Sequence, residues 1–212
     1  MIISPSSLLL FITGAAILLV IPGPAILYIV STSIAHGRSA GFISVLGVVT
    51  GTLIHVAAAT VGLSAILASS ALAFQCVKYV GAAYIIYLGI RTLRSGDTPL
   101  LDAANGDKNL SRIFGQGVLV NLLNPKTILF FLAFLPQFVE TARGHAALQI
   151  LQLGLLFALM SWIADSGWAA LASVIGARLR ASLRLHRAQR NISGGILIAV
   201  GLVALLSAAR SR

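Results

Sequence analysis

Charged side chains are scarce in this chain. Asp, Glu, Lys and Arg make up 9% of the 212 residues, whereas hydrophobic residues make up 58% and the mean hydropathy is +0.98. A soluble domain carries roughly a quarter charged residues, so this composition excludes nearly every soluble enzyme. The apolar segments show no alternation of polar and apolar residues, which excludes a transmembrane barrel. The composition therefore predicts an all-α integral membrane protein.

Cysteine and the common catalytic motifs are also missing. A single cysteine, Cys76, excludes a disulfide framework, a CxxC redox pair and a thiolate metal cluster. The sequence has no HExxH, GxSxG or P-loop motif, and its histidines are scattered without metal-ligand spacing: His36, His55, His145 and His186. We therefore predict no enzyme, no catalytic residues, no metal and no cofactor. Transport by such a chain would have to be driven by a gradient, because no nucleotide site is visible.

Six apolar segments are long enough to cross a bilayer, which takes about 20 residues for each helix. They cover approximately residues 6–34, 40–67, 72–93, 113–138, 148–175 and 192–209. The first lies in an uncharged stretch, residues 1–35, that has no basic n-region and is too long for a cleaved signal peptide, so we expect a retained helix. Five spans would result if one segment were only re-entrant. One transmembrane domain is predicted over residues 1–212.

The basic residues lie mainly in the loops between these segments, and their distribution predicts the orientation of the chain. One side of the membrane would hold ten of them: Arg38, Arg91, Arg94, Lys108, Arg112, Arg178, Arg180, Arg184, Arg187 and Arg190. The other side would hold four: Lys78, Arg143, Arg210 and Arg212. We therefore expect the loop 94–112 in the cytoplasm and both termini outside. The net charge of +10 is interpreted as this topology signal and not as nucleic-acid binding.

Three spans, a loop and three further spans give two halves of opposite orientation, residues 1–93 and 113–212. Inverted repeats of this kind are typical of secondary transporters, often with broken helices at matching positions. The first span is interrupted at Pro22-Gly23-Pro24 and the fourth at Asn124-Pro125-Lys126, with Ile-Leu shortly beyond each break. We therefore predict two inverted three-helix repeats with broken first and fourth helices.

Both breaks are candidate substrate sites. Proline removes a backbone donor and interrupts a helix, and the freed backbone groups need partners in protein, water or substrate because lipid offers none. The candidate binding residues at the breaks are Pro22, Gly23, Pro24, Asn124, Pro125 and Lys126. The alternative is a pair of kinks that serve only packing.

Lys126 and Asp165 are charged candidates within the spans. A lysine at the bilayer centre costs about 2.5–3.5 kcal/mol on insertion scales, so such a charge usually faces a cavity. Lys126 would pair with Asp165 or receive a substrate carboxylate, unless the fourth span begins later and Lys126 marks the interface. Asp165 is the only acid in a predicted span, so we expect it to relay protons or to bind a cation. Its alternative role is that of a structural counter-charge for Lys126.

Another candidate, His55, follows two glycines. The motif Gly47-x-x-x-Gly51-x-x-x-His55 places the three residues on one face of the second span. The glycines would admit a neighbouring backbone, and His55 beside them could relay protons near neutral pH. The alternative is a histidine that is simply hydrogen-bonded within the bundle.

Five stretches of the chain form a series: Pro22-Gly23-Pro24, the motif from Gly47 to His55, GAAYIIYLGI at 81–90, NLLNPKT at 121–127 and FLPQF at 134–138. Together they resemble the LysE/RhtB family of bacterial amino-acid exporters. The resemblance runs over essentially the whole chain. Asn-Pro-Lys followed by Leu-Pro-Gln-Phe is its most specific part.

The resemblance implies a six-span exporter in the bacterial inner membrane that moves amino acids such as threonine, homoserine or lysine by proton antiport. It adds Asn121 to the substrate-binding candidates and implies proton coupling through Asp165 and His55. The implied partners are an amino acid, protons and the lipid bilayer, in a monomer or a homodimer. Members of this family carry the fifth-span acid about one turn earlier, near Ser161, on the same helix face. Gradient-driven efflux of metal cations or of another small metabolite is the alternative function.

Overall fold

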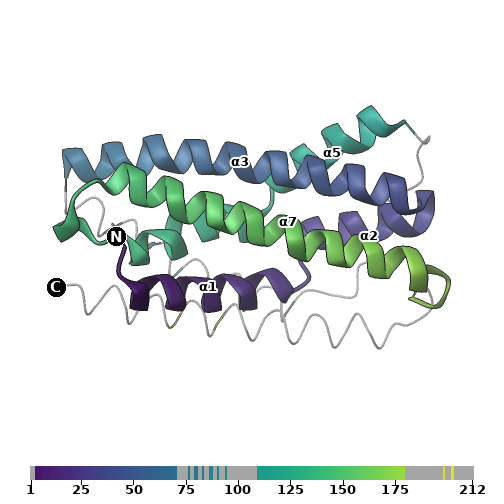
Figure 1. Ribbon diagram of the computed structural model, residues 1–212, viewed down its shortest axis with the longest axis horizontal. Helices are drawn as coiled ribbons and strands as arrows, with labels where there is room; N and C mark the ends of the chain where they lie inside the picture. Colours follow the sequence, from purple (N-terminus) through teal and green to yellow (C-terminus); the bar gives the residue numbers. More distant parts are fainter. Residues whose placement is uncertain are drawn as a thin grey trace.

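The computed structural model of the chain describes residues 3–70 and 109–179, together with positions 76, 79, 80, 83, 86, 87, 90, 94, 198 and 202. Within these residues every regular element is a helix (Figure 1). The expected third and sixth spans and most of the loop 94–112 lie outside the described residues. In chain order the elements are α1 (Pro5–Val20), α2 (Pro24–His36), α3 (Arg38–Ser69), α5 (Leu110–Leu122), α6 (Pro125–Leu129), the π-helix η2 (Phe130–Phe134), the 3-10 helices η3 (Leu135–Phe138) and η4 (Thr141–Arg143), and α7 (Ala146–Leu179).

The long helices α3 and α7 pack against each other along the bundle (Figure 1). They contain 32 and 34 residues, so each is about 50 Å long at 1.5 Å per residue. The stretches Arg38–Leu63 and Ala146–Val174 are long and apolar enough to cross a membrane, in agreement with the predicted second and fifth spans. Helix α2 packs on both long helices, and α5 packs on α3.

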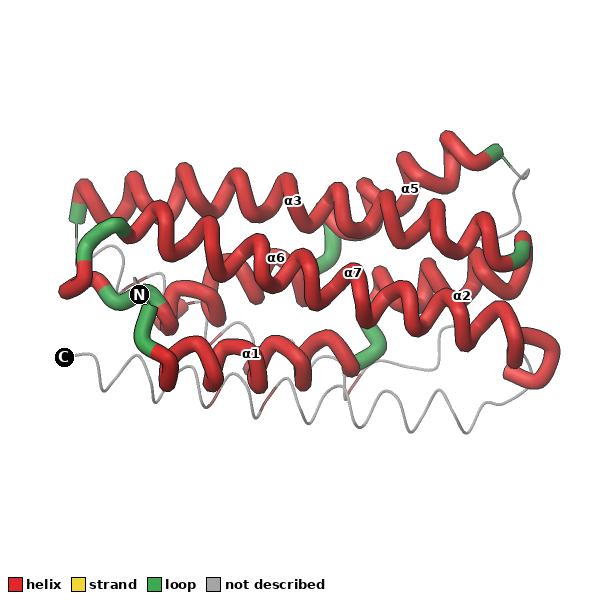
Figure 2. Tube along the Cα trace, viewed as in Figure 1, coloured by secondary structure: helices red, strands yellow, loops and turns green. Residues whose placement is uncertain are grey.

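The predicted first and fourth spans are both broken. The chain bends by 49° between α1 and α2, and by 49° between α5 and the segment Lys126–Phe138. If each bent pair is one span, the described residues provide four spans by length and composition, and otherwise two. Both breaks lie near the middle of the bundle's length, whereas the other connections lie at its ends (Figure 2).

Proline determines where the first span is interrupted. Ile21 precedes Pro22 and takes an extended conformation (φ −69°, ψ 120°), as residues before proline usually do. Gly23 is also extended, and Pro24 opens α2. Proline suits this first helical position because the N–H it lacks would have no partner within the helix.

The second break follows the same plan. Asn124 is extended (φ −73°, ψ 110°) before Pro125, and its side-chain Oδ1 accepts the backbone N–H of Lys126 at 3.1 Å. Asn124 therefore caps the short helix α6, which continues into the π-helix η2 and the 3-10 helix η3. Asparagine is among the best residues for this capping position.

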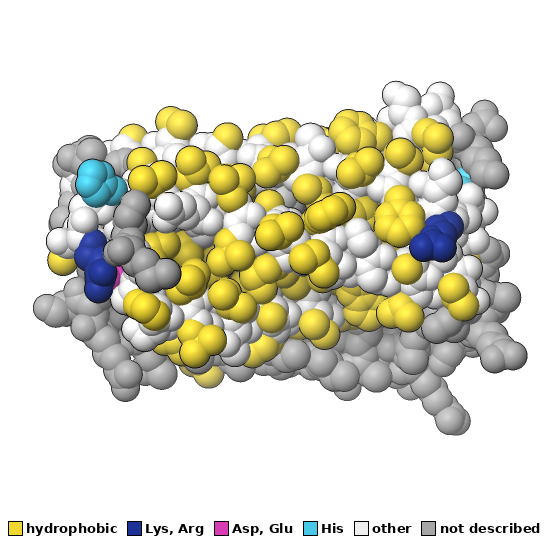
Figure 3. All heavy atoms as spheres, viewed as in Figure 1, with side chains coloured by type: hydrophobic (Ala, Val, Ile, Leu, Met, Phe, Trp, Pro, Cys, Tyr) yellow, Lys and Arg dark blue, Asp and Glu magenta, His cyan; other side chains and the backbone are white. Residues whose placement is uncertain are grey.

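The two ends of the bundle carry different connections. At one end, here called the N-terminal end, the backbone N–H of Ser4 donates to Glu140 Oε1 at 3.0 Å. At the opposite end α2 turns into α3 at Gly37, whose φ of +84° suits glycine, and Asn109 caps the start of α5. Side chains of Lys and Arg lie at the two ends of the visible face, and the surface between them is largely hydrophobic (Figure 3), as expected for contact with lipid.

The described residues form two apolar cores, one on each side of the breaks. The larger fills the N-terminal half and is rich in phenylalanine, contributed by α1, the segment α6–η3 and α7. The smaller lies between α2, α3 and α7 and contains Ala25, Tyr28, Ile29, Val45, Val48 and Ala169. The polar groups of the breaks therefore lie between two apolar regions.

Candidate functional site

The two helix breaks meet, and Lys126 joins them. Its Nζ donates hydrogen bonds to the backbone oxygens of Leu18 and Ile21, at 3.0 and 2.8 Å. A Cβ added to Gly23 would lie 3.5 Å from Lys126 Cε. The last carbonyls of a helix have no partner within the helix and form the negative end of its dipole. The ammonium of the second break therefore caps the C-terminal end of α1 at the first.

Asp165 lies on α7 and is 3% exposed. Its Oδ2 accepts a hydrogen bond from Ser161 Oγ at 2.8 Å, one helical turn earlier. The two positions thus share one face of α7, as their spacing predicts. No hydrogen bond or ion pair of Asp165 Oδ1 is found within residues 3–70 and 109–179.

Lys126 and Asp165 face the same region without a direct ion pair. Their charges interact electrostatically, but the ion pair found among the described side chains is that of Glu140 with Arg143. The direct contact that was one alternative for Lys126 is therefore not formed, and its ammonium bonds to carbonyls instead. A cation and a carboxylate inside a membrane bundle thus remain separated.

Asn124 presents a donor without an acceptor in the part of the chain that the structure describes. Its side chain is 1% exposed, and Oδ1 is used in the cap of α6, whereas no acceptor is found for Nδ2. A buried donor left without an acceptor costs about 1–3 kcal/mol. Asn124 is therefore able to donate to an oxygen of a bound solute.

Asn121 differs from Asn124 because its amide is fully used. Its Nδ2 donates to Val48 O at 2.7 Å and to Thr52 Oγ1 at 2.8 Å, and its Oδ1 accepts from Thr127 Oγ1 at 2.9 Å. Asn121 therefore ties α3, α5 and α6 together across the second break. In this conformation the amide nitrogen and oxygen of Asn121 both brace the site.

His55 also contacts Asn121, through the backbone of that residue. Its Nε2 is 3.2 Å from the backbone oxygen of Asn121, to which a protonated nitrogen donates. Its ring stacks on Phe131, with 5.7 Å between centroids. The structure has His55 hydrogen-bonded within the bundle, as in the alternative stated from the sequence, and gives it no contact with Lys126 or Asp165.

The glycines of the His55 motif admit α5, as predicted. A Cβ on Gly47 would lie 2.3 Å from Phe114 O, and one on Gly51 would lie 2.9 Å from Asn121 Cβ. The prolines of the first break are less enclosed: Pro22 and Gly23 are half-buried and Pro24 is exposed. Pro125 occupies the first turn of α6.

Sequence reasoning missed three groups of the site. The carbonyls of Leu18 and Ile21 have no signature in the sequence, because every residue carries one. Ser161 did have a signal, since it lies four residues before Asp165 and on the same helix face. As for the alternative of a metal cation, no group of three or more His, Cys, Asp or Glu that could hold a metal ion occurs among the described side chains.

Broken membrane helices with a lysine, a carboxylate and freed backbone groups near the breaks are typical of a membrane transporter. Comparison with known proteins agrees: the chain matches the LysE type translocator family over residues 16–208. The chain belongs to this family. It is therefore a multi-pass membrane transporter of the efflux type and not an enzyme.

Individual relatives cover most of the chain. A homoserine/homoserine lactone efflux protein of Salmonella typhimurium is 35% identical over 181 residues, which are 85% of this chain and 86% of the relative. An uncharacterised membrane protein of Vibrio cholerae is 32% identical over 176 residues, or 82% of this chain and 84% of the relative. One from Bacillus subtilis is 31% identical over 164 residues, or 73% and 78%. No solved structure matches the chain significantly.

Proposed function

We propose that this protein exports small amino acids and closely related metabolites from the bacterial cytoplasm, and that they bind where the two helix breaks meet. The observation that carries the proposal is the separation of Lys126 from Asp165. Each charge is held in place by other groups of the protein, and no ion pair joins them. A zwitterion placed between the two would pair both charges at once.

The available hydrogen-bonding groups match an amino acid. A lysine ammonium has three donors, and Lys126 uses two of them on the backbone oxygens of Leu18 and Ile21, which leaves one for a carboxylate oxygen. The Nδ2 of Asn124 supplies a second donor for an oxygen. Asp165 and Ser161 would receive the substrate ammonium, because a charge-assisted hydrogen bond to a carboxylate is about twice as strong as a neutral one.

The Salmonella typhimurium relative is named for efflux of homoserine and homoserine lactone, and these two compounds indicate which contacts a substrate would need. Homoserine and its lactone share an α-ammonium group, but the lactone lacks a free carboxylate. If this chain transports the same pair, Asp165 makes the contact common to both substrates. The Nδ2 of Asn124 can then donate a hydrogen bond to the carboxylate of homoserine or to the carbonyl of its lactone.

We assign proton coupling to Asp165. A buried carboxylate needs a neutralising partner, and a proton and a substrate ammonium would compete for that place. Release of the substrate as a proton enters gives antiport. His55 would act indirectly, through its contact with the backbone of Asn121 at the second break.

We also propose the orientation expected from the basic residues, with the N-terminal end in the periplasm. Ser4 and Glu140 share one end of the bundle, as an even number of crossings between them requires, and the basic residues then decide which side that end faces. Arg143 lies at this end, whereas Arg38 and Arg112 flank the connections at the other.

The test is efflux from preloaded cells with three compounds: homoserine, homoserine lactone, and γ-butyrolactone, which lacks the ammonium. The unaltered chain should accelerate the loss of the first two and not of the third. Asp165→Asn keeps the side-chain shape and removes the charge. Loss of a charged hydrogen bond, worth about 1.5–3 kcal/mol, predicts roughly 10- to 150-fold slower efflux.

Membrane abundance must be measured beside efflux, because a structural carboxylate would reduce the amount of folded protein instead. Asp165→Asn at normal abundance with undiminished uphill efflux would show that Asp165 is not the coupling residue. Efflux of γ-butyrolactone, or of a metal cation in place of the amino acids, would refute the proposed substrate class.

A further inference from the structure

From the order of residues along three packed segments, we propose that the N-terminal end of the bundle is the gate through which the substrate leaves. The gate has two layers, here named the clasp and the plug. The clasp consists of Ser4, Ser7, Glu140 and Gln149, and the plug consists of Phe11, Phe130, Phe131, Phe134, Phe138 and Phe157. This inference rests on the proposed function for its direction of transport, whereas the closed gate itself stands on the contacts below.

The clasp ties the start of α1 to the connection before α7. The Ser7 hydroxyl donates to Glu140 Oε1 at 2.8 Å, and the Ser4 backbone N–H donates to the same oxygen at 3.0 Å. Arg143 pairs with the other oxygen of the carboxylate. These contacts join positions more than 130 residues apart in the sequence. Separation of α1 from α7 at this end would therefore have to break them.

Gln149 holds Glu140 in position from the side of α7. It is fully buried; its Oε1 accepts the backbone N–H of Glu140 at 2.8 Å, and its Nε2 donates to the backbone oxygens of Glu140 and Gly144, at 3.1 and 2.7 Å. The acceptor of the clasp is therefore fixed on the α7 side, and the donors are on α1. The two sides of the clasp can therefore separate by breaking the hydrogen bonds that Ser4 and Ser7 donate to Glu140.

The plug lies directly beneath the clasp. Phe11 of α1 contacts Phe138 and Phe130, with 5.4 and 5.8 Å between ring centroids, and Phe130 stacks on Phe157 of α7 at 3.7 Å. The Phe134 ring fits against Gly14, where an added Cβ would lie 2.5 Å from its Cζ. These rings join all three segments into one apolar layer.

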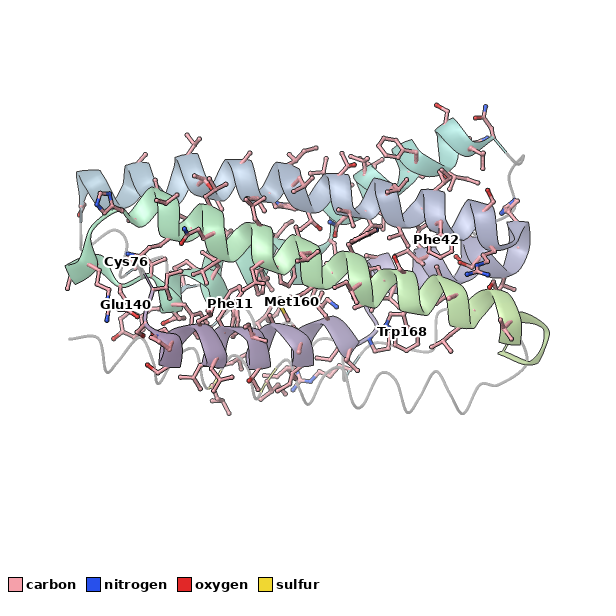
Figure 4. The ribbon with its side chains drawn as sticks, in the orientation of Figure 1. Phe11, Phe42, Cys76, Glu140, Met160 and Trp168 are labelled. Carbon is pink, nitrogen blue, oxygen red and sulfur yellow. The ribbon has the colours of Figure 1, made fainter. Side chains whose placement is uncertain are left out.

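The order of layers is the same in each of the three segments. Along α1 the clasp serines come first, then Phe11, then the carbonyls that Lys126 binds. The segment from Lys126 to Glu140 passes from site to plug to clasp, and α7 runs from Gln149 past Phe157 to Asp165. Figure 4 shows Glu140 at the end of the bundle, Phe11 further in, and Met160, which precedes Ser161, closer to the middle.

The secondary structure of the plug is suited to movement. Residues 130–134 form a π-helix that passes into a 3-10 helix, and departures of this kind from α-helix frequently mark functional hinges. The clasp, by contrast, does not open by protonation near neutral pH, because the serine contacts hold the pKa of Glu140 at about 2. Opening therefore requires that α1 moves away from α7.

The experiment measures access from outside to a buried cysteine below the plug. Ala15 is fully buried beside Phe11 and lies between the plug and the carbonyls of Leu18 and Ile21. In a Cys76→Ser background, Ala15→Cys is exposed to a membrane-impermeant maleimide added to intact cells. The labelling rate needs no substrate, so it tests the gate even if the proposed substrates are wrong.

Ser7→Ala and Ser6→Ala form a matched pair. Ser7 donates to Glu140, whereas Ser6 contacts the Ser4 hydroxyl at the exposed surface. We expect Ser7→Ala to label about tenfold faster than Ser6→Ala, since a factor of ten corresponds to about 1.4 kcal/mol, close to one hydrogen bond to a charged group. Equal rates would overturn the gate, as would faster labelling from the cytoplasmic side in inverted vesicles.

A second measurement does not depend on the Ala15 reporter. Ser7→Cys with Glu140→Cys, again without Cys76, places two thiols where the clasp contact lies. A cross-link there should stop efflux of preloaded homoserine, and reduction should restore it. Each single cysteine variant given the same treatment is the control. Undiminished efflux through a cross-linked clasp would refute the gate, because release could not then require its opening.

Discussion

Replacement of Gly47 by alanine tests the contact that positions the whole second break. The added Cβ would lie 2.3 Å from Phe114 O and 3.1 Å from Gly117 Cα, and both of these are backbone atoms. Ordinary contact begins near 3.4 Å, so α3 and α5 would have to separate by about 1 Å in an interior that is close-packed. The hydrogen bond from Asn121 to Val48 O would lengthen as a result.

The cost can be worked from these contacts. Overpacking of a well-packed interior costs about 1–3 kcal/mol, and the weakened hydrogen bond adds about 1 kcal/mol. Gly47→Ala should therefore destabilise the protein by about 2–4 kcal/mol. Since about 1 kcal/mol shifts the Tm of a chain of this size by about 2–4 °C, the midpoint should fall by about 4–16 °C.

Gly62→Ala is the matched control in the same helix. A Cβ on Gly62 would meet no atom of the described residues within 4 Å, and alanine favours a helix over glycine by up to about 1 kcal/mol. The two substitutions are thus expected to shift stability in opposite directions. Tm is measured on purified protein in detergent, with efflux beside it. If Gly47→Ala is as stable as Gly62→Ala, the close approach of α3 and α5 is wrong.

Three further predictions concern the brace, the clasp and the orientation. Asn121→Ala should lower Tm because it removes three buried hydrogen bonds, to Val48 O and to the hydroxyls of Thr52 and Thr127, whereas Asn124→Ala should weaken homoserine binding more than it lowers Tm; the reverse order would contradict the roles assigned to the two amides. The pKa of Glu140 is lowered from 4.5 to about 2, so its contribution to stability is complete above pH 4.5 and is lost as the pH falls towards 2. Glu140→Gln should remove that acid-dependent drop in Tm, and an unchanged profile would mean that another group causes it. A phosphatase reporter fused after Arg212 should be active, since that enzyme works only in the periplasm; an inactive fusion at normal abundance would refute the even number of spans.

Much of the architecture could be predicted because a bilayer demands long apolar helices. The second and fifth spans follow from apolar composition and are continuous helices, α3 and α7. The breaks at Pro22 and Pro125 follow from the missing N–H of proline, and the chain bends there. The close approach at Gly47 follows from the absence of a side chain. In each case one local property decides the structure.

The partners within the site could not be predicted in this way. The sequence left Lys126 with a choice between Asp165 and a substrate, and the structure gives it the carbonyls of Leu18 and Ile21 instead. The two asparagines of the NLLNPKT motif look alike in sequence. One is fully bonded and the other has a donor without an acceptor among the described residues, and that difference depends on α3.

The sequence by itself determined the class of this protein: apolar helices that span a membrane, helix breaks at two prolines, and a lysine and an acid where lipid would not tolerate them. Those properties belong to single residues and short stretches, so they can be read without coordinates. Only the tertiary structure decided that the two breaks meet, that Lys126 and Asp165 remain separated, and that Ser7 reaches Glu140 across the bundle. The reason is physical: carbonyls exist at every residue, and contacts between distant segments depend on how whole helices pack.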